Sequence, residues 1–288
     1  EGVIVMYDVA IIGAGPAGIS AALTLKNLSK NFVLFGSDEL SEKILKSERI
    51  ANYPGVGSVS GKEFVGMLKK QLNDCGISVT CKRINNVFFI DGKFMLLSGD
   101  EIIEACAVIY AGGTESIKHI NGEAEFLGKG VSYCATCDGF LYKGKTLAIV
   151  AESEKFEHEV EFLSSLAEKT YVCRLYKGDL PPVEICGDVK VNSIRNGNGD
   201  VIPVDGVFVL KNCMAASDLI KGVVSEDGHV VTDRSQETSL KGCFAAGDCV
   251  GAPYQIAKAV GEGNVAAHSA GTFLAAKNKL NHAKTLAK

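Results

Sequence analysis

Long apolar runs and clusters of positive charge are both missing from this sequence. No apolar stretch approaches the roughly 20 residues of a membrane span, and the opening EGVIVMYDVAIIG has no cationic segment before a long apolar one. Lys and Arg are scattered through a chain with a net charge of -4, so no basic surface is predicted for nucleic acid. We therefore expect a cytoplasmic protein that engages neither a membrane nor nucleic acid.

A regular cysteine framework is also missing, although the chain of 288 residues contains ten cysteines. Two of them, Cys134 and Cys137, are separated by only two residues. In a reducing compartment, a pair this close is more often catalytic or metal-binding than structural. The others stand in apolar runs at irregular spacing, which predicts small core residues: Cys75, Cys81, Cys106, Cys173, Cys186, Cys213, Cys243 and Cys249.

The first third of the chain has the order strand, turn, helix, strand. Residues 7–12 are a β-branched run, residues 16–28 carry apolar side chains at helical spacing, and residues 32–35 return to strand character. Residues 108–113 predict a later strand of the same sheet. This order is typical of a dinucleotide-binding unit.

The turn after the first strand, GAGPAG at residues 13–18, fits the dinucleotide fingerprint. In this fingerprint Gly13 allows the turn, Gly15 allows close approach of a pyrophosphate, and Gly18 lets the helix pack on the strand. Its place between a strand and a helix favours a nucleotide site over an ordinary glycine-rich turn. The second strand ends at residues 34–37 without the acidic residue that often binds a ribose, which counts against NAD here.

A second contact segment stands near the end of the chain, GCFAAGD at residues 242–248. An apolar strand here delivers Asp248 to a turn, where its carboxylate is able to bond the ribityl or phosphate region of a flavin. This segment favours FAD as the nucleotide of the first site. The alternative is a strand that ends in a capping Asp.

The strand, helix, strand pattern recurs in the middle of the chain, at residues 146–150, 154–166 and 170–174. The C-terminal segments, residues 238–249 and a predicted helix at residues 254–276, resemble material that completes the first domain, so the second unit is predicted to be an insertion. We expect an α/β fold with two Rossmann-like (three-layer ββα) dinucleotide-binding domains. The first comprises residues 1–115 and 241–288, and the inserted one comprises residues 116–240.

The segment Cys134-Ala-Thr-Cys137-Asp138 has the spacing that lets two sulfurs meet at a helix N-terminus, where the dipole lowers a thiol pKa. Cys134 is the predicted attacking thiolate. One alternative is zinc, but the sequence has no second C-x-x-C or His pair at a matching spacing. Another is a pair of core cysteines beside Tyr133 and Phe140. Asp138 is either a general acid for the leaving thiolate or a helix cap.

With these pieces in order, the chain resembles the low-molecular-weight thioredoxin reductases over essentially its whole length. CATCD is specific to that family, whereas the glycine fingerprints are shared by many flavoproteins. The resemblance implies an FAD in the first domain, a dithiol on the inserted domain, thioredoxin as electron acceptor, and a homodimer. Besides the first glycine loop, it is carried by NYPG at 52–55, YAGG at 110–113, GVSYCATCDG at 130–139, residues 238–248 and QIA at 255–257.

The resemblance also implies roles for single residues. Cys137 faces the flavin, Cys134 attacks the disulfide of thioredoxin, and Asp138 takes the proton-transfer position. At residues 41–44 this chain has Ser-Glu-Lys-Ile where the family has Gly-Gly-Gln-Leu, a departure that affects contacts to the flavin ring. The implied flavin contacts are Gly13, Gly15, Pro16, Ala17, Gly18, Gly36, Lys43, Ile44, Asn52, Gly112, Gly247, Asp248, Gln255 and Ile256.

The second nucleotide unit departs furthest from the family, which has Gly-x-Gly-x-x-Ala after the strand and His-Arg-Arg at the end of the next. This chain has AESEKF at residues 151–156 and RLY at residues 174–176. The side chains of Ala151 and Ser153 occupy the space that a pyrophosphate needs. Glu152 and Glu154 repel the pyrophosphate, since the repulsion between two unit charges about 5 Å apart costs roughly 3 kcal/mol of binding free energy. The Arg pair for a 2'-phosphate is lost. We expect a vestigial NADPH-binding fold.

A reductase without a pyridine-nucleotide site needs another electron source, and this pattern is similar to ferredoxin-dependent flavin thioredoxin reductases. The resulting hypothesis is that electrons pass from reduced ferredoxin, via FAD and the Cys134-Cys137 dithiol, to thioredoxin. One alternative is an NADPH-dependent thioredoxin reductase with a degenerate NADPH site, and another is a diflavin-linked disulfide oxidoreductase. A flavin- or zinc-containing binding module without turnover is a further alternative, against which Asp138 argues.

Overall fold

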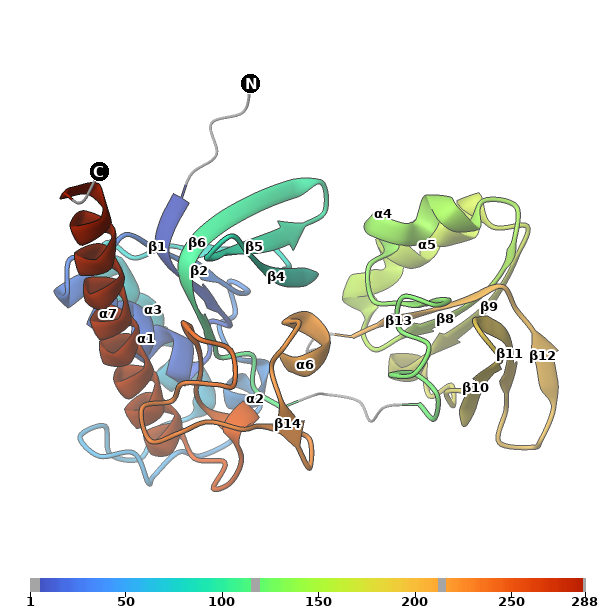
Figure 1. The fold of residues 1–288 in the computed structure, drawn as a ribbon. Helices are drawn as coiled ribbons and strands as arrows, with labels where there is room; N and C mark the ends of the chain where they lie inside the picture. The colour runs from blue at the N-terminus through green and yellow to red at the C-terminus, as the bar shows by residue number, and fades with distance from the viewer. Residues whose placement is uncertain (1–5, 115–119, 212–215, 287–288) are drawn as a thin grey trace. The chain divides into compact units, whose positions relative to one another are not determined.

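The computed structural model describes residues 6–114, 120–211 and 216–286, and the chain divides into two compact units. Unit 1 combines Glu1–Thr114 with Ala215–Lys288, and unit 2 is Glu115–Met214 (Figure 1). Both units pair parallel strands with helices, so the predicted α/β architecture is confirmed. None of the helices in the described part combines the length and the apolar character that a membrane span requires.

Unit 1 is built on a mixed seven-stranded sheet. Strand β6 is central: β1 pairs with it on one side, while on the other side β5 pairs with its first half and β16 with its second half. Strands β1, β2, β6 and β16 are parallel and therefore end at one edge. The main path is β3 (Val79–Thr80), β2 (Phe32–Phe35), β1 (Met6–Ile12), β6 (Glu101–Tyr110), β5 (Lys93–Ser98) and β4 (Asn86–Ile90), with β16 (Cys243–Ala245) beside β6.

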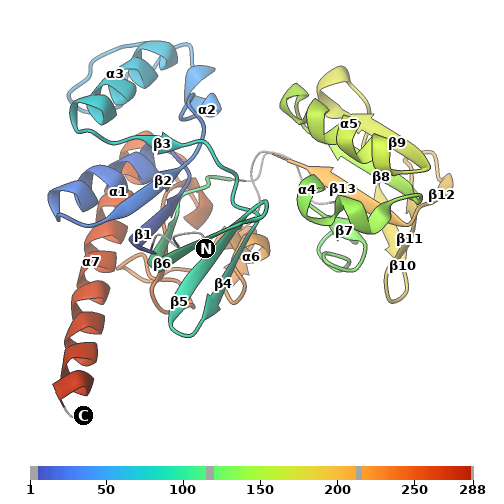
Figure 2. The same cartoon turned by 90° about the horizontal axis from the view of Figure 1, so that it is seen from above.

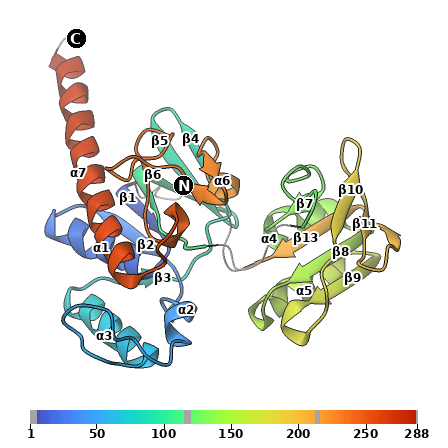
Figure 3. The same ribbon diagram turned by 90° about the horizontal axis from the view of Figure 1, so that it is seen from below.

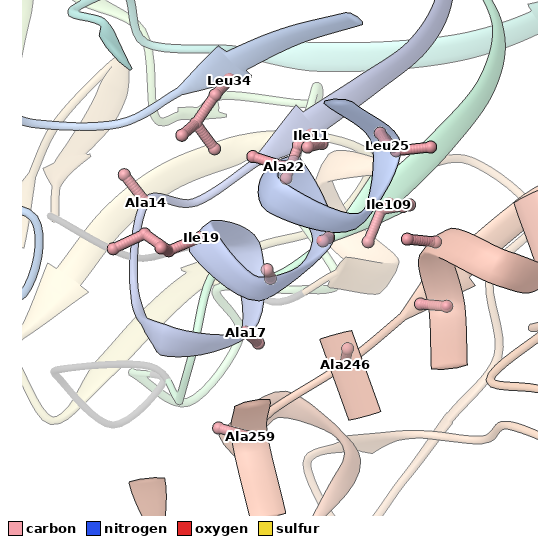
Figure 4. Packing of buried hydrophobic residues seen from close by; sticks show 14 of the residues in the cluster. Ile11, Ala14, Ala17, Ile19, Ala22, Leu25, Leu34, Ile109, Ala246 and Ala259 are labelled. Carbon is pink, nitrogen blue, oxygen red and sulfur yellow. The ribbon is translucent and has the colours of Figure 1, made fainter. Parts of the chain in front are cut away.

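The helices of unit 1 are α1 (Pro16–Asn27), α2 (Glu42–Leu45), α3 (Gly61–Asp74) and α7 (Ile256–Leu286). Helices α1 and α7 lie side by side (Figures 1 and 3). They approach closely at Gly263 of α7, where an added Cβ would lie 2.0 Å from the Ala17 carbonyl oxygen, so only a glycine fits there. Ser20 Oγ also donates to the Val260 carbonyl at 2.6 Å. Figure 4 shows Ile19 and Leu25 of α1 in the core formed with the sheet.

Unit 2 contains a four-stranded parallel sheet in the order β7 (Val131–Ser132), β13 (Gly206–Leu210), β8 (Thr146–Ala151) and β9 (Lys169–Arg174). Helix α5 (Glu157–Leu166) lies along β8 and β9 (Figure 2), and Val160 and Leu163 bury its apolar face. An antiparallel sheet of β10 (Glu184–Gly187), β11 (Val191–Arg195) and β12 (Val201–Pro203) completes the unit, together with α4 (Ala135–Asp138) and the 3-10 turns η1 (Gly139–Tyr142), η2 (Glu154–Phe156) and η3 (Leu175–Lys177).

The chain returns to unit 1 earlier than the expected residue 241. Residues 216–240 hold α6 (Ala216–Leu219) and the hairpin of β14 (Ser225–Glu226) and β15 (His229–Val230), and η4 (Asp248–Val250) follows β16. Ile220 is fully buried and bridges to Val87 of β4, while Glu237 bridges to Phe244 of β16. Residues 216–240 therefore extend the sheet of unit 1, which a turn-rich sequence does not reveal.

Three predicted elements also differ in their bounds. The strand expected at 108–113 begins earlier, at Glu101, and ends at Tyr110. It does not reach residue 113 because the chain turns at Gly113, whose φ is +77°. The helix expected from Glu154 starts with the turn η2, and α5 begins at Glu157. The helix expected from Tyr254 begins at Ile256, after a turn in which the Gln255 N–H donates to the Pro253 carbonyl.

Candidate functional site

Four predicted contact residues follow four of the parallel strands of unit 1. Gly13 follows β1, Gly36 follows β2, Gly112 comes two residues after β6, and Gly247 comes two residues after β16. Since parallel strands end at the same edge, these glycines gather there. Nucleotides bind outside the carboxyl ends of such strands, so the sheet alone places a candidate site at this edge.

The glycine loop at residues 13–18 separates into two sterically tight positions and one open one. Gly13 has a φ of +112°, and an added Cβ would lie 2.2 Å from the Ala111 carbonyl oxygen. At Gly18 the added atom would lie 1.8 Å from the Gly13 carbonyl oxygen. At Gly15 it would meet no protein atom within 4 Å. Gly13 and Gly18 are therefore required by the fold, whereas Gly15 leaves space beside the start of α1.

The N-terminus of α1 is suited to a phosphate. Its N-cap is Gly15, and Pro16 is the first helical residue. Among the residues that the structure describes, no side chain caps this terminus, and the first turn contains no acidic residue. The backbone N–H groups and the positive end of the helix dipole are thus directed at the open space next to Gly15. A pyrophosphate is the group that such a terminus binds, so the residues present fit a dinucleotide.

Two pairs of predicted contacts, each joining distant parts of the chain, are brought together in unit 1. Lys43 Nζ lies 2.5 Å from Asp248 Oδ2 and 5.2 Å from the centroid of the Tyr254 ring. Asn52 Nδ2 donates to Gln255 Oε1 at 2.7 Å. These side chains belong to segments about 200 residues apart, and their pairing supports one shared site.

The remaining predicted contacts are mainly held by packing. Ala17 is buried beneath the first loop, and Ile44 is buried in α2. A Cβ added to Gly36 would lie 2.3 Å from the Ala14 Cβ. A Cβ added to Gly112 would lie 2.5 Å from the Tyr110 hydroxyl oxygen. Ile256 opens α7.

The cysteine pair lies in unit 2, at the end of β7. Cys134 is 8% exposed and carries a disulfide bond, and it stands directly before α4. Cys137 belongs to α4, but its side chain lies outside the described part of the structure, so its pairing with Cys134 stays a prediction. A sulfur held in a disulfide is not a thiolate and does not ligate zinc in that state.

Asp138 is connected to Cys134 through Ser132, a residue that the sequence did not single out. The Ser132 hydroxyl donates to Asp138 Oδ2 at 2.6 Å and accepts from the Cys134 backbone N–H at 3.1 Å. Asp138 stands at the N-cap position of η1, but its side chain makes no capping bond to that turn. Burial, together with the charges of Asp138 and Asp205, raises the pKa of Tyr142, which keeps this phenol neutral.

Three of the other described cysteines are not suited to thiolate chemistry. Burial raises the pKa of Cys243 and of Cys249 to about 12 and that of Cys173 to about 11, so these sulfurs remain protonated and weakly nucleophilic. Cys81 was predicted to be a core residue and this is wrong, because it is exposed and its thiol donates to Asp38 Oδ1 at 3.1 Å. Cys213 lies outside the described residues.

Both ends of the second nucleotide loop, residues 151–156, are buried in the core of unit 2, while Glu154 and Lys155 between them are exposed. Ala151 at the end of β8 is fully buried, and Phe156 is 6% exposed among the apolar residues beneath α5. Helix α5 carries Glu157 and Glu159 in its first turn. Carboxylates at this terminus take the place that an anionic ligand needs, since both are favoured by the same end of the helix dipole.

One of these carboxylates also pairs with Arg174, which stands where the family has a histidine, while Leu175 and Tyr176 replace the two arginines. Arg174 Nε donates to Glu157 Oε1 at 2.6 Å and Arg174 Nη2 to Glu157 Oε2 at 3.1 Å, and the Tyr176 hydroxyl donates to the same carboxylate. The hydrogen bond that Arg174 donates to Glu157 lowers the pKa of Glu157 and raises the pKa of Arg174. Glu157 was not identified from the sequence.

Comparison with known proteins agrees with this geometry. Residues 7–151 match the family model described as pyridine nucleotide-disulphide oxidoreductase. The chain belongs to this family. Among its relatives is a thioredoxin reductase of Helicobacter pylori, 33% identical with 93% of this chain and 99% of the relative covered. Another is the thioredoxin reductase of Listeria innocua, 31% identical with 93% and 94% covered.

A solved structure of the family is closely similar. The ferredoxin-flavin thioredoxin reductase of Clostridium acetobutylicum superimposes with a TM-score of 0.87 at 41% identity, covering 96% of this chain and all of that one. The chain is thus an FAD-dependent disulfide oxidoreductase of the thioredoxin reductase type. The residues that would hold the FAD are those gathered at the carboxyl edge of the unit 1 sheet.

Proposed function

We propose that this thioredoxin reductase receives its electrons from reduced ferredoxin rather than from NADPH. The observation that carries the proposal is the occupied second nucleotide site. Phe156, at the end of the loop, is buried in the core, and Glu157, at the start of α5, pairs with Arg174. A 2'-phosphate would have to displace a bidentate, charge-assisted pair, and Leu175 and Tyr176 stand where the family has its two arginines. The similarity to the ferredoxin-flavin enzyme of Clostridium acetobutylicum supports the same donor.

The dithiol passes two electrons to thioredoxin. FAD, when bound, supplies the conversion between a one-electron donor and this two-electron exchange. The Cys134 thiolate attacks the thioredoxin disulfide and forms a mixed disulfide, while the other thioredoxin sulfur leaves and takes up a proton. The Cys137 thiolate then attacks Cys134, which restores the Cys134-Cys137 disulfide and releases reduced thioredoxin. We assign proton transfer to a departing sulfur to Asp138, whose carboxylate accepts a hydrogen bond from Ser132, the residue that also binds the Cys134 backbone N–H.

The test compares donors on the same holoprotein. The anaerobic protein is mixed with NADPH or with reduced ferredoxin, flavin absorbance is followed, and thioredoxin thiols are counted. We expect ferredoxin to bleach the flavin and to support repeated turnover, and NADPH to do neither. Rapid bleaching by NADPH would overturn the proposal in favour of an NADPH-dependent enzyme. Two flavins per chain would overturn it in favour of a diflavin enzyme.

A cysteine variant tests the path beyond the flavin. Cys134→Ser should leave flavin reduction intact and abolish thioredoxin turnover, because the attacking sulfur is gone. Cys173→Ser is the matched control in unit 2, since burial raises the pKa of that thiol to about 11, and it should turn over like the parent. Turnover retained by Cys134→Ser would contradict the assigned role. The resemblance further predicts a homodimer, which sedimentation would test.

A further inference from the structure

A fully buried ion pair lies beside the dithiol of unit 2. Lys211 and Glu123 both have side chains with 0% exposure, and Lys211 Nζ lies 2.8 Å from Glu123 Oε1. The Tyr133 hydroxyl donates to the same oxygen at 2.8 Å, and the Lys211 ammonium lies 4.6 Å from the centroid of the Tyr133 ring. The second carboxylate oxygen accepts the Ile120 backbone N–H at 2.9 Å. One carboxylate therefore connects three parts of the chain.

Two of these parts are the ends of unit 2. Ile120 is the first described residue of the unit, and Lys211 is the last one before residues 212–215. Lys211 also directly follows β13, which pairs with β7, the strand that leads to the cysteines. The Glu123 carboxylate thus joins the entrance of unit 2 to its exit, and joins both to Tyr133.

The third part is the dithiol segment itself. Tyr133 is 5% exposed and immediately precedes Cys134, and Ser132 on its other side binds the Cys134 N–H and Asp138. The backbone leading to the Cys134 sulfur is therefore fixed from two sides, by Ser132 and by the tyrosine held in the ion pair.

A buried ion pair is weak evidence for stability, because desolvating both charges costs about as much as their attraction returns. Its directional bonds instead favour one arrangement of the groups that they join. We propose that Glu123 and Lys211 are positioning residues, which hold Tyr133 and hence Cys134 in the geometry that makes the disulfide hard to reduce. This inference rests on the proposed role of Cys134 as a redox-active sulfur.

The test is the equilibrium of the holoprotein disulfide with dithiothreitol, which delivers two electrons and two protons and becomes the cyclic disulfide. Lys211→Met and Tyr133→Phe are compared with the parent, and melting temperature is recorded for each. With Cys134 less well placed, the effective concentration of one thiol at the other falls. We expect Lys211→Met to shift the equilibrium toward the dithiol about tenfold, or roughly 30 mV, and Tyr133→Phe to shift it less in the same direction.

Arg195→Met is the matched control, because the Arg195–Glu184 pair of the same unit is about half exposed and should leave the equilibrium unchanged. Variants that melt earlier but keep the parental equilibrium would overturn the inference, since they would show a structural role alone. If Lys211→Met does not fold, Tyr133→Phe, which keeps both charges, decides by the same criterion. Dithiothreitol needs neither ferredoxin nor NADPH, so the result does not depend on which of them is the electron donor. If dithiothreitol does not reduce a disulfide at Cys134 in the parent protein, the role of Cys134 as a redox-active sulfur is overturned as well.

Discussion

The two nucleotide loops of this protein have the same place in the fold and opposite properties. In unit 1, residues 13–18 leave open space at Gly15 and an uncapped helix start without acidic residues. In unit 2, residues 151–156 bury Ala151 and Phe156, and the following helix begins with glutamates. Both units nevertheless retain the strand, turn, helix, strand order. The order is maintained by core packing, whereas ligand binding depends on a few positions that packing does not require.

The difference is clearest where an aromatic side chain stands in place of a small residue. Burying an apolar side chain of this kind contributes about 1.5–3 kcal/mol, so Phe156 stabilises unit 2 while it occupies the space a nucleotide loop would use. Gly18 of unit 1 allows no such gain, since any Cβ meets the Gly13 carbonyl. At this position of the loop, burial of Phe156 in the core of unit 2 therefore replaces the steric requirement that a glycine meets in unit 1.

The largest effect is expected where the first loop is tightest. Gly18→Val places two methyl groups beyond a Cβ that already lies 1.8 Å from the Gly13 carbonyl oxygen, so α1 must separate from β1. We expect unit 1 to lose its FAD and to melt at a much lower temperature, as measured by flavin absorbance per chain and by circular dichroism. Phe156→Leu, at the matching position of unit 2, should keep its flavin. A flavin-bound, stable Gly18→Val protein would contradict the steric argument.

A smaller and more selective effect is expected at the open position. Gly15→Ala meets no protein atom, so the apoprotein should melt within a degree or two of the parent, but the methyl group lies where the pyrophosphate approaches. We expect FAD to bind roughly tenfold to hundredfold more weakly, about 1.4–2.8 kcal/mol. Titration of apoprotein with FAD measures this. Parental affinity would show that Gly15 does not face the nucleotide.

The next prediction concerns Arg174, the arginine at the end of β9. Glu157→Gln removes the charge that holds Arg174 and Tyr176, so Arg174 becomes available to a phosphate. We expect 2',5'-ADP to bind about fivefold more tightly than to the parent, with NADPH still unable to reduce the flavin because Phe156 remains. Calorimetry measures the affinity. Glu161→Gln, on the exposed side of α5, is the matched control, and an equal gain there would point to net charge alone.

The smallest effect is a pH dependence of unit 2. The hydrogen bond from Arg174 lowers the pKa of Glu157 below its ordinary value. A carboxyl group of this kind contributes stability above its unfolded pKa and loses it as the pH falls through the folded pKa. The difference in melting temperature between the parent and Glu157→Gln should therefore be present at pH 7 and diminish once the pH falls below the ordinary pKa of a glutamate. A difference that grows on acidification would reverse the assigned sign.

The local parts of this comparison were available from the sequence. The spacing of Gly13, Gly15 and Gly18 depends on neighbouring residues of one turn, and the structure gives each glycine a separate steric role. The first strands and helices depend on apolar periodicity and lie where it predicts. The substitutions at residues 151–156 also indicated an altered second site before any fold was known.

The parts that were missed depend on contacts between distant residues. Glu123 and Lys211 are 88 positions apart, and a single charged residue after the apolar strand β13 does not show which partner would bury it. Glu157 and Arg174 meet because α5 and β9 both adjoin β8. Likewise, the return to unit 1 at Ala215 depends on a bridge from Ile220 to Val87. Such pairings are decided by topology, which the sequence expresses only through the whole fold.

The insertion of unit 2 into unit 1 has a consequence for synthesis on the ribosome. Unit 2 is complete once residue 214 has been made, whereas unit 1 still lacks β16 and α7. Gly263, which packs on Ala17, is translated after all of unit 2. Domains tend to fold as units during synthesis, so the unit that carries Cys134 and Cys137 is ready to fold before unit 1 has its final strand, and α1 waits for its partner α7.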